Sequence, residues 1–164
     1  MSKPMRLPTQ AADQTYFITS STDGRERYFA YPKYAELFIE TLYRYRQKQK
    51  YRLHCFVVMP EHFHLLITPR GITIERALQL IKGGYSFRVS GELNRHFDIW
   101  ERGFTDRRVR SGEYEGFKNY IEENPVKAGL AKTAQEYPCG SASGKYELDP
   151  PPAWLLTSAA KAGA

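Results

Sequence analysis

The chain is organised around one apolar stretch that contains a histidine pair, Val57-Val58-Met59-Pro60-Glu61-His62-Phe63-His64-Leu65-Leu66-Ile67. Pro60 lacks a backbone N–H, so it cannot lie in a central strand and it divides the run in two. We therefore predict an antiparallel hairpin of two strands, Tyr51–Val58 and His62–Thr68, joined by a tight connection at Met59–Glu61.

The two histidines of this stretch lie two residues apart, and side chains alternate between the faces of a strand. His62 and His64 therefore share one face, whereas Phe63 points to the other and Glu61 is expected on the face opposite to the histidines. Neutral imidazole is a common ligand of divalent metal ions, so two imidazoles on one face indicate a metal site. The alternative is a pair of structural histidines, the role that we expect for His54.

The whole sequence predicts strands and helices in the order β-α-β-β-α-β-α. β-branched and aromatic residues indicate the strands, and apolar residues spaced three and four apart indicate the helices. The last helix is expected to begin at a Ser N-cap and to end at an Asn-Pro pair. The predicted elements are a strand at Gln14–Ser20, a helix from Pro32 to about Lys50, the two hairpin strands, a helix after its N-cap Thr73, a strand within Phe97–Arg110, and a helix from the N-cap Ser111 to Asn124-Pro125.

This order is typical of an α+β fold, namely a ferredoxin-like or RRM-like antiparallel sheet with helices on one face and an additional C-terminal helix. The histidine pair would then face away from the helix-covered side. We predict a flexible N-terminal end at residues 1–12, one domain at residues 13–131, and a C-terminal tail or arm at residues 132–164, where the composition shifts toward Pro, Gly and Ser.

Two glycines, Gly83 and Gly84, lie inside the second predicted helix. Glycine in a helix interior costs about 1 kcal/mol relative to alanine, so the pair needs a reason. Either the backbone approaches the sheet or a ligand phosphate closely there, or the helix is kinked.

The composition is basic: the 164 residues carry a formal net charge of +6 and a pI near 9.3. Such a balance is typical of proteins that bind nucleic acids or other anionic surfaces. No apolar run approaches the ~20 residues of a membrane span, and Met1–Gln10 lacks the apolar segment of a secretory signal. Cys55 and Cys139 are the only cysteines, which argues against a disulfide framework. We therefore expect a reduced, cytoplasmic protein without a membrane partner.

Basic residues gather in two clusters, one at residues 44–52 and an arginine-only one at residues 102–110 that is flanked by Trp100 and Phe104. Arginines beside aromatic rings suit phosphate contacts and base stacking. The alternative is an ordinary solvated surface. Six arginines are predicted to contact DNA: Arg44, Arg88, Arg102, Arg107, Arg108 and Arg110.

The last predicted helix carries Tyr120 at the edge of a buried stripe that Tyr114, Phe117 and Ile121 form. A tyrosine in this place is more often half-buried packing, with its hydroxyl in water, than a catalytic residue. Spacing alone leaves both readings open.

Four blocks of sequence together point to a known family. They are Met59-Pro60-Glu61-His62-Phe63-His64-Leu65-Leu66, Ile81-Lys82-Gly83-Gly84-Tyr85-Ser86-Phe87-Arg88, Ile99-Trp100-Glu101-Arg102-Gly103-Phe104, and Tyr120-Ile121 with Asn124-Pro125-Val126-Lys127-Ala128-Gly129-Leu130. In this order they resemble the REP-associated tyrosine transposases, domesticated relatives of the single-tyrosine insertion-sequence transposases in the HUH nuclease superfamily. The resemblance covers roughly residues 13 to 140. Members often have Asn where this chain has Glu61, and many have His where it has Arg107.

The resemblance assigns roles to individual residues. It implies that His62 and His64 are ligands of a divalent metal, Mg²⁺ or Mn²⁺, that Tyr120 is the nucleophile, and that Asn124 completes the metal shell. Residues 13–131 would then be an HUH-type catalytic domain. Tyr120 and Asn124 lie one helical turn apart and can face the hairpin together. Because Asn before Pro is also a good N-cap for a following short helix, both roles of Asn124 stay open.

The implied activity is metal-dependent cleavage of single-stranded DNA at hairpin-forming repeats, with strand transfer through a 5′-phosphotyrosine. No nucleotide cofactor is expected, because the chain has no Walker-type glycine loop. The alternatives are an HUH replication initiator or relaxase, a non-catalytic RRM-like module, and a two-histidine phosphoesterase, for which the segments at His54 and His96 supply no second motif. Monomer and dimer both stay open.

Overall fold

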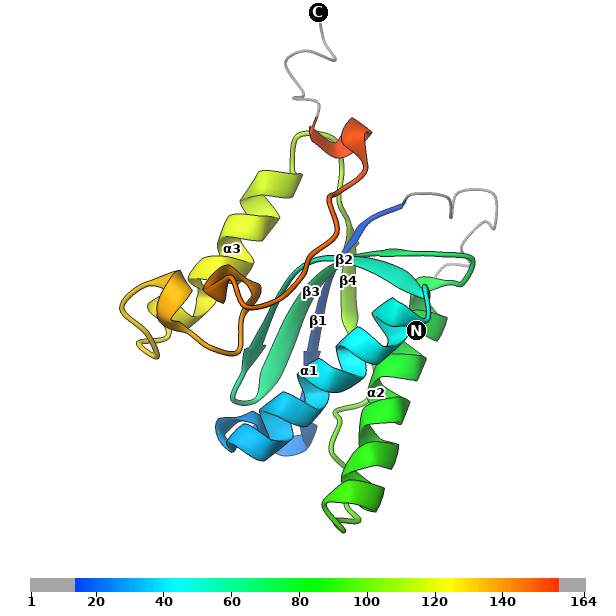
Figure 1. Cartoon of the computed structure of the whole chain (residues 1–164), viewed down its shortest axis with the longest axis vertical. Helices are drawn as coiled ribbons and strands as arrows, with labels where there is room; N and C mark the ends of the chain where they lie inside the picture. The colour runs from blue at the N-terminus through cyan, green and yellow to red at the C-terminus, as the bar shows by residue number, and fades with distance from the viewer. Residues whose placement is uncertain (1–13, 157–164) are drawn as a thin grey trace, which may run out of the picture.

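The computed structural model describes residues 14–156 and shows a four-stranded sheet with helices on both faces (Figure 1). The helices and strands are β1 (Tyr16–Ser21), α1 (Pro32–Gln47), β2 (Tyr51–Met59), β3 (His62–Pro69), α2 (Ile74–Glu92), β4 (Thr105–Arg108) and α3 (Tyr114–Lys127). Short 3-10 turns occupy Asp23–Arg25, Tyr28–Ala30, Ala134–Glu136, Ser141–Ser143 and Ala153–Leu156. The predicted element order is confirmed, with differences at helix ends described below.

The strands lie in the order β2-β3-β1-β4, and each neighbouring pair is antiparallel. β3 therefore lies between β1 and β2, which run parallel to each other, and β1 lies between β3 and β4 in the same way. Two split β-α-β units that share a sheet define the ferredoxin-like arrangement. The predicted fold class is thus confirmed.

Alternation along β3 divides the molecule into two apolar layers. On one face Phe63 and Leu65 pack with α1 and α2 in the larger core, which includes Phe38 and Tyr85. On the other face Leu66 packs with residues of α3 in a smaller core. In Figure 1, α1 and α2 lie together on one side of the sheet, and α3 lies apart from them. The histidines share the face of Leu66, so they look toward α3.

The hairpin prediction is confirmed to within one residue at each strand, and β2 carries an irregularity between Leu53 and Cys55. His54, at this irregularity, is 2% exposed. Its Nε2 lies 2.8 Å from Thr68 Oγ1, and its Nδ1 lies 2.8 Å from the Asp149 carbonyl oxygen. Burial lowers the pKa of His54. It is a structural histidine, as expected.

Helix packing explains one of the two glycines of α2. A Cβ on Gly84 would lie 2.5 Å from the Tyr45 hydroxyl of α1, whereas nothing lies within 4 Å of a Cβ on Gly83. At Gly84 the close approach is therefore to a neighbouring helix and not to the sheet. The kink is wrong as well, because α2 continues as one helix from Ile74 to Glu92.

Helix α3 differs from its prediction at both ends. Its N-cap is Glu113 rather than Ser111. It also continues through Pro125 to Lys127, and the Ala128 N–H donates to the Asn124 carbonyl oxygen at 3.0 Å. Pro125 is buried, so packing outweighs the preference of a pre-proline residue for extended backbone. Asn124 thus lies inside the helix and is not the N-cap of a following one.

The C-terminal arm, residues 132–156, packs along the outer edge of β2 (Figure 1, orange). The Val58 N–H donates to the Cys139 carbonyl at 2.8 Å, and the Tyr137 hydroxyl donates to the Val58 carbonyl at 2.7 Å. The arm thereby satisfies backbone groups that an edge strand otherwise exposes. The flexible end predicted at residues 1–12 lies outside the described residues. No helix among residues 14–156 is long and apolar enough to span a membrane.

Asp149 fastens this arm to the domain. Its carboxylate accepts two hydrogen bonds from the Arg46 guanidinium, at 2.8 and 2.9 Å, and a third from the Leu53 N–H at 2.8 Å. Its own N–H donates to the Leu53 carbonyl at 2.8 Å. Partial burial alone would raise the pKa of Asp149, but the hydrogen bonds from Arg46 and Leu53 outweigh it and lower the pKa.

We expect Asp149→Asn to lower the free energy of unfolding by about 1–3 kcal/mol at pH 7, because it weakens charge-assisted hydrogen bonds. A carboxyl whose folded-state pKa is lowered stabilises the fold above its ordinary pKa of 3.8 and loses that contribution as the pH falls through the folded-state pKa. The difference from wild type should therefore shrink below about pH 3.8 in urea titrations. Asp98→Asn, at an exposed loop carboxylate, is the control. A pH-independent difference would contradict this account.

Candidate active site

The histidine pair lies at the end of β3 next to the hairpin turn. In the sheet His64 pairs with Thr19 of β1 and His62 with Ser21. The two ring centroids are 4.8 Å apart, and His64 is 4% exposed. The strand therefore does what the spacing predicted and places both imidazoles side by side on one face.

A hydrogen bond fixes one nitrogen of each imidazole. His64 Nδ1 lies 2.8 Å from Thr19 Oγ1, and His62 Nδ1 lies 2.9 Å from Glu61 Oε1. The same carboxylate oxygen of Glu61 lies 3.3 Å from the Arg25 guanidinium. An ionised carboxylate can only accept, so His62 Nδ1 carries the proton and Nε2 keeps its lone pair. Outer partners of this kind orient the histidines of metal sites.

The position of Glu61 corrects an expectation. Strict alternation would place it on the face opposite to the histidines, but it lies in the turn rather than in the strand. Its side chain is therefore free to turn toward His62, where it contributes a hydrogen bond and negative charge.

Burial keeps both histidines neutral. Burial, with a smaller contribution from the neighbouring His62, lowers the pKa of His64 to about 4. Burial also lowers the pKa of His62, although the hydrogen bond to Glu61 opposes the shift. At neutral pH the pair thus presents two uncharged imidazoles, the form in which histidine binds a metal.

Tyr120 of α3 lies beside this pair. Its ring centroid is 5.5 Å from that of His64, and Tyr120 is 46% exposed. The Lys127 ammonium lies 5.8 Å from the same ring centroid. Because α3 continues past Pro125, Asn124 follows Tyr120 by one turn on the same side of the helix. The structure thus brings together the histidines and the tyrosine that the sequence singled out.

The other tyrosine of this helix, Tyr114, is unlike Tyr120. It is 4% exposed and packs in the smaller core with Cys55, and its ring centroid lies 6.2 Å from that of His54. Burial raises the pKa of Tyr114, which disfavours the phenolate. Of these two tyrosines, only Tyr120 lies beside the histidine pair with an exposed side chain.

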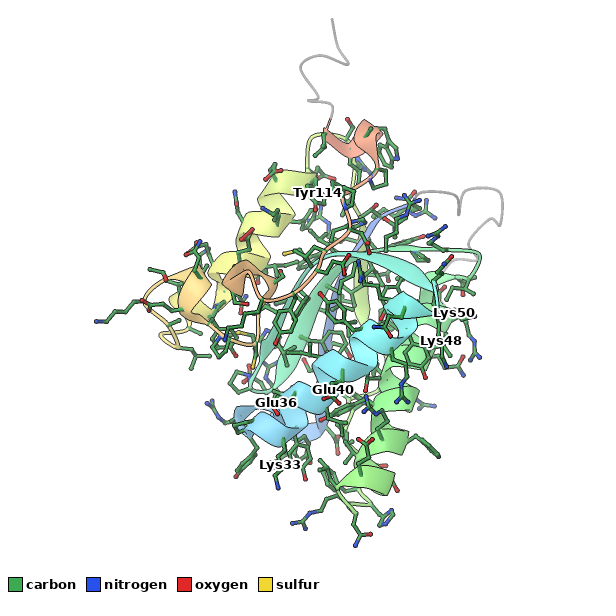
Figure 2. All side chains as sticks on the ribbon, viewed as in Figure 1. Lys33, Glu36, Glu40, Lys48, Lys50 and Tyr114 are labelled. Atoms are coloured by element: carbon green, nitrogen blue, oxygen red, sulfur yellow. The ribbon has the colours of Figure 1, made fainter. Side chains whose placement is uncertain are left out.

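The arginines predicted to contact DNA fall into two groups. Those of the second cluster are exposed on β4 or next to it; they are Arg102, Arg107, Arg108 and Arg110. Arg44 is exposed on α1, in the layer on the far side of the sheet from α3. Figure 2 shows Lys48 and Lys50 near the end of α1, away from Tyr114 at the start of α3. Arg44 therefore lies on the other side of the sheet from the histidine pair, which faces α3.

Arg88 is corrected by the structure. Its side chain is 11% exposed, and the guanidinium forms ion pairs with Glu40 at 3.0 Å and Glu92 at 3.3 Å. It also donates to Thr41 Oγ1 at 3.2 Å. Two carboxylates already neutralise this arginine, so we no longer assign it to DNA.

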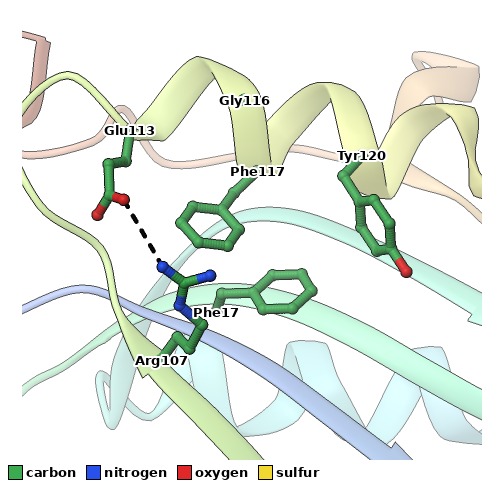
Figure 3. A pocket seen from close by; sticks show the side chains of 6 residues that line it. All are labelled: Phe17, Arg107, Glu113, Gly116, Phe117 and Tyr120. Atoms are coloured by element: carbon green, nitrogen blue, oxygen red, sulfur yellow. Dashed lines mark ion pairs between the residues drawn. The ribbon is translucent and has the colours of Figure 1, made fainter.

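A groove opens beside Tyr120 between α3 and strands β1 and β4 (Figure 3). It has a volume of about 530 Å³ and is lined by Phe17, Arg107, Glu113, Gly116, Phe117 and Tyr120.

Trp100, which flanks the arginines in the sequence, does not line this groove. It packs against Phe38 and Phe63 of the larger core, and its Nε1–H donates to the Lys82 carbonyl at 2.9 Å. Base stacking on Trp100 is therefore wrong.

Known proteins share the sequence pattern and the fold of this chain. The profile of the family described as "Transposase IS200 like" matches residues 11–124. The chain belongs to the IS200-like transposase family. It is therefore an enzyme, and the resemblance stated from the sequence is confirmed. A REP-associated tyrosine transposase from Escherichia coli (strain K12) is 24% identical over 149 residues, which cover 82% of this chain and 83% of the relative.

Solved structures of similar fold agree with this transposase architecture. One is a REP-associated tyrosine transposase bound to a REP hairpin, with a TM-score of 0.69, 22% identity, and coverage of 98% of this chain and 96% of that one. Another is a protein from Deinococcus radiodurans R1, with a TM-score of 0.52, 18% identity, and coverage of 73% and 97%. At these identities the likeness shows the fold.

Sequence reasoning missed four residues at the site of this transposase: Phe17, Thr19, Glu61 as a partner of His62, and Phe117 as a groove wall. Thr19 and Phe17 reach the site through the register of β1 against β3, which no local pattern reveals. The alternation of Tyr16 to Ser21 was the one available signal, because it places Phe17 and Thr19 on the same face.

We expect Glu61→Ala to remove the preference of His62 for the Nδ1–H tautomer, because the acceptor is lost. Glu61→Gln retains an acceptor oxygen and should retain the tautomer, so it is the matched control. Long-range ¹H–¹⁵N NMR of the imidazole nitrogens measures the tautomer directly. An unchanged His62 pattern in Glu61→Ala would show that the carboxylate does not set it.

Proposed function

We propose that this transposase cleaves single-stranded DNA with Tyr120 as the nucleophile and rejoins strands through a 5′-phosphotyrosine. One observation supports this most strongly: the exposed ring of Tyr120 lines a groove, and its centroid lies 5.5 Å from that of His64 in the neutral histidine pair. Nucleophile and phosphate-activating groups must be close together for such a displacement.

The substrate proposed is DNA that forms a hairpin with single-stranded flanks. The similar solved transposase is bound to a REP hairpin, and the net charge of +6 suits a polyanion. Arg107 and Arg108 lie on β4 and Arg110 lies two residues beyond it, next to the groove that leads to Tyr120. We assign phosphate contacts to them and to Arg102, with Arg44 as a remote contact of a longer substrate.

The residues present fit a divalent metal ion, Mg²⁺ or Mn²⁺. His62 and His64 are neutral, their Nδ1 atoms are hydrogen-bonded, and their Nε2 atoms are the nitrogens left to bind a metal. Among residues 14–156 no third His, Cys, Asp or Glu joins them in a metal-binding group. We therefore assign a further ligand to the Asn124 amide oxygen, and the remaining ligands to substrate oxygens and water. When bound, such an ion polarises the scissile phosphate and offsets its developing charge.

The steps assigned to the protein are few. The phenol of Tyr120 loses its proton, its oxygen forms a bond to phosphorus, and the bond from phosphorus to the 3′ oxygen of the upstream nucleotide breaks. The leaving oxygen takes up a proton and becomes a 3′-hydroxyl. Because the phosphotyrosine is again a diester, attack by a 3′-hydroxyl can reseal DNA without a nucleotide cofactor.

Two of the alternatives lose support. A two-histidine phosphoesterase needs a catalytic histidine from a second sequence motif. His54 is buried and hydrogen-bonded on both nitrogens, and His96 is exposed beside Ser90. A non-catalytic RRM-like module disagrees with membership of an enzyme family. An HUH replication initiator or relaxase would use the same chemistry in another setting.

A cytoplasmic location, with DNA as the partner, remains part of the proposal.

We expect Tyr120→Phe to fold and to bind hairpin DNA like wild type but to form no covalent adduct, because it lacks the attacking oxygen. Tyr31→Phe, at a tyrosine that is 65% exposed in the other layer, is the matched control and should form the adduct normally. The adduct is measured on denaturing gels with one oligonucleotide labelled in turn at each end.

Only the 3′-labelled strand should shift into a protease-sensitive band, because the 3′ segment carries the attacked phosphate. The 5′-labelled fragment should run free and be extendable by a polymerase. A shifted band with the 5′ label, or an adduct in Tyr120→Phe, would overturn the assignment.

We expect His62→Ala and His64→Ala each to slow metal-dependent cleavage by about 100-fold or more, the effect of losing several kcal/mol of transition-state stabilisation. Hairpin binding should change little, since the arginines carry it. His96→Ala, at an exposed histidine, is the matched control. Circular dichroism checks the fold of each variant, and Mn²⁺ titration checks the metal. Full cleavage in the presence of a chelator would exclude the metal site.

A further inference from the structure

We infer that the groove beside Tyr120 is a subsite for one unpaired nucleobase of the DNA strand, next to the scissile phosphate. The inference rests on the proposed function and adds to it a position at which the protein holds a base rather than the DNA backbone. Its walls are the rings of Phe17 and Phe117, with Arg107 at one end and Tyr120 at the other (Figure 3).

The walls form one continuous series of flat groups. The ring centroids of His64 and Phe17 are 5.3 Å apart with planes at 19°, and those of Phe17 and Phe117 are 4.9 Å apart with planes at 27°. The Arg107 guanidinium carbon lies 5.2 Å from the Phe117 centroid. The series of rings therefore runs from the histidine pair to Arg107, the first residue of the arginine segment Arg107–Arg110. Stacking on aromatic and guanidinium planes is how proteins hold unpaired bases, since every base has a π-face.

The two phenylalanines are not ordinary core residues. Phe38 and Phe63 of the larger core are fully buried, whereas Phe17 and Phe117 are only partly buried and line an open groove. Apolar rings that stay partly in water beside a reacting hydroxyl indicate a surface that a flat apolar partner covers. At the Tyr120 end of the groove, the rings of Phe17 and Tyr120 meet edge to face, with their centroids 5.8 Å apart.

Charge favours DNA as the occupant. Arg107 is 66% exposed, and its ion pair with Glu113 is long, at 3.7 Å. A second hollow that shares Arg107 and Glu113 with the groove is lined by Arg108 and Arg110. A strand whose base enters the groove can thus lay its phosphates along the arginine segment. Glu113 and Arg107 offer an acceptor and donors at the edge of the base, the groups that base edges complement.

The test uses the full chain with Tyr120→Phe, which we expect to bind DNA without cleaving it. The fluorescent base 2-aminopurine, whose emission falls when it stacks, is placed at each single-stranded position flanking a hairpin in turn. We expect strong quenching at one position and its loss when Phe117→Leu is added, because leucine keeps the apolar volume but not the ring. Phe97→Leu, at a partly exposed ring outside the groove, is the matched control and should leave the quenching unchanged.

A second measurement uses the cleaving protein. An abasic site at the quenched position should slow adduct formation by about 10- to 100-fold in wild type. The same abasic site should add little in Phe117→Leu, which has already lost the stacking. Circular dichroism and sedimentation establish that the variants fold and keep their oligomeric state.

The outcomes separate the subsite from the nucleophile. Position-specific quenching in Tyr120→Phe, together with no adduct in the wild-type protein, would overturn Tyr120 as the nucleophile and leave the subsite standing. A normal adduct with equal quenching at all positions, or with quenching unaffected by Phe117→Leu, would overturn the subsite alone. A change of oligomeric state in Phe117→Leu with quenching intact would show that a second copy of the chain, and not a base, covers the groove.

Discussion

The alternation of side chains along β3 is the constraint on which this structure depends. It sends Phe63 and Leu65 into the core beneath α1 and α2, and with the same geometry it sends His62 and His64 to the opposite face. A shift of the strand by one residue would turn the histidines into the larger core and Phe63 toward α3. The larger core therefore fixes the position of the histidine pair, and the stability of the fold and the geometry of the site have a common origin.

The second apolar layer performs the corresponding task for the tyrosine. Ile121 and Tyr114 anchor α3 against Val57 and Leu66 of the sheet, and this contact sets the rotation of the helix. Tyr120 precedes Ile121 by one residue, so it emerges at the edge of the contact, beside His64 rather than in the core. A residue that spacing alone describes as edge packing thus becomes the group that faces the histidines.

Much of this arrangement could be predicted from the sequence, because it follows from local rules. Pro60 marked the hairpin, period-two and period-3.6 patterns gave the elements, and their order gave the sheet. Long-range contacts could not be predicted in this way. Gly84 leaves room for the side chain of Tyr45, which lies on α1. Arg88 forms an ion pair with Glu40, which also lies on α1. The continuation of α3 through its proline depends on burial, which outweighs a backbone preference.

We propose that DNA becomes attached to the one tyrosine that α3 presents to the histidine pair. Peptide mapping of the adduct tests it most directly, because trypsin separates Tyr114, in the peptide Ser111–Lys118, from Tyr120, in the peptide Asn119–Lys127. Tandem mass spectrometry of the digested adduct should find the nucleotide on the hydroxyl of Tyr120. A nucleotide on Tyr114, or on any residue outside Asn119–Lys127, would contradict the account.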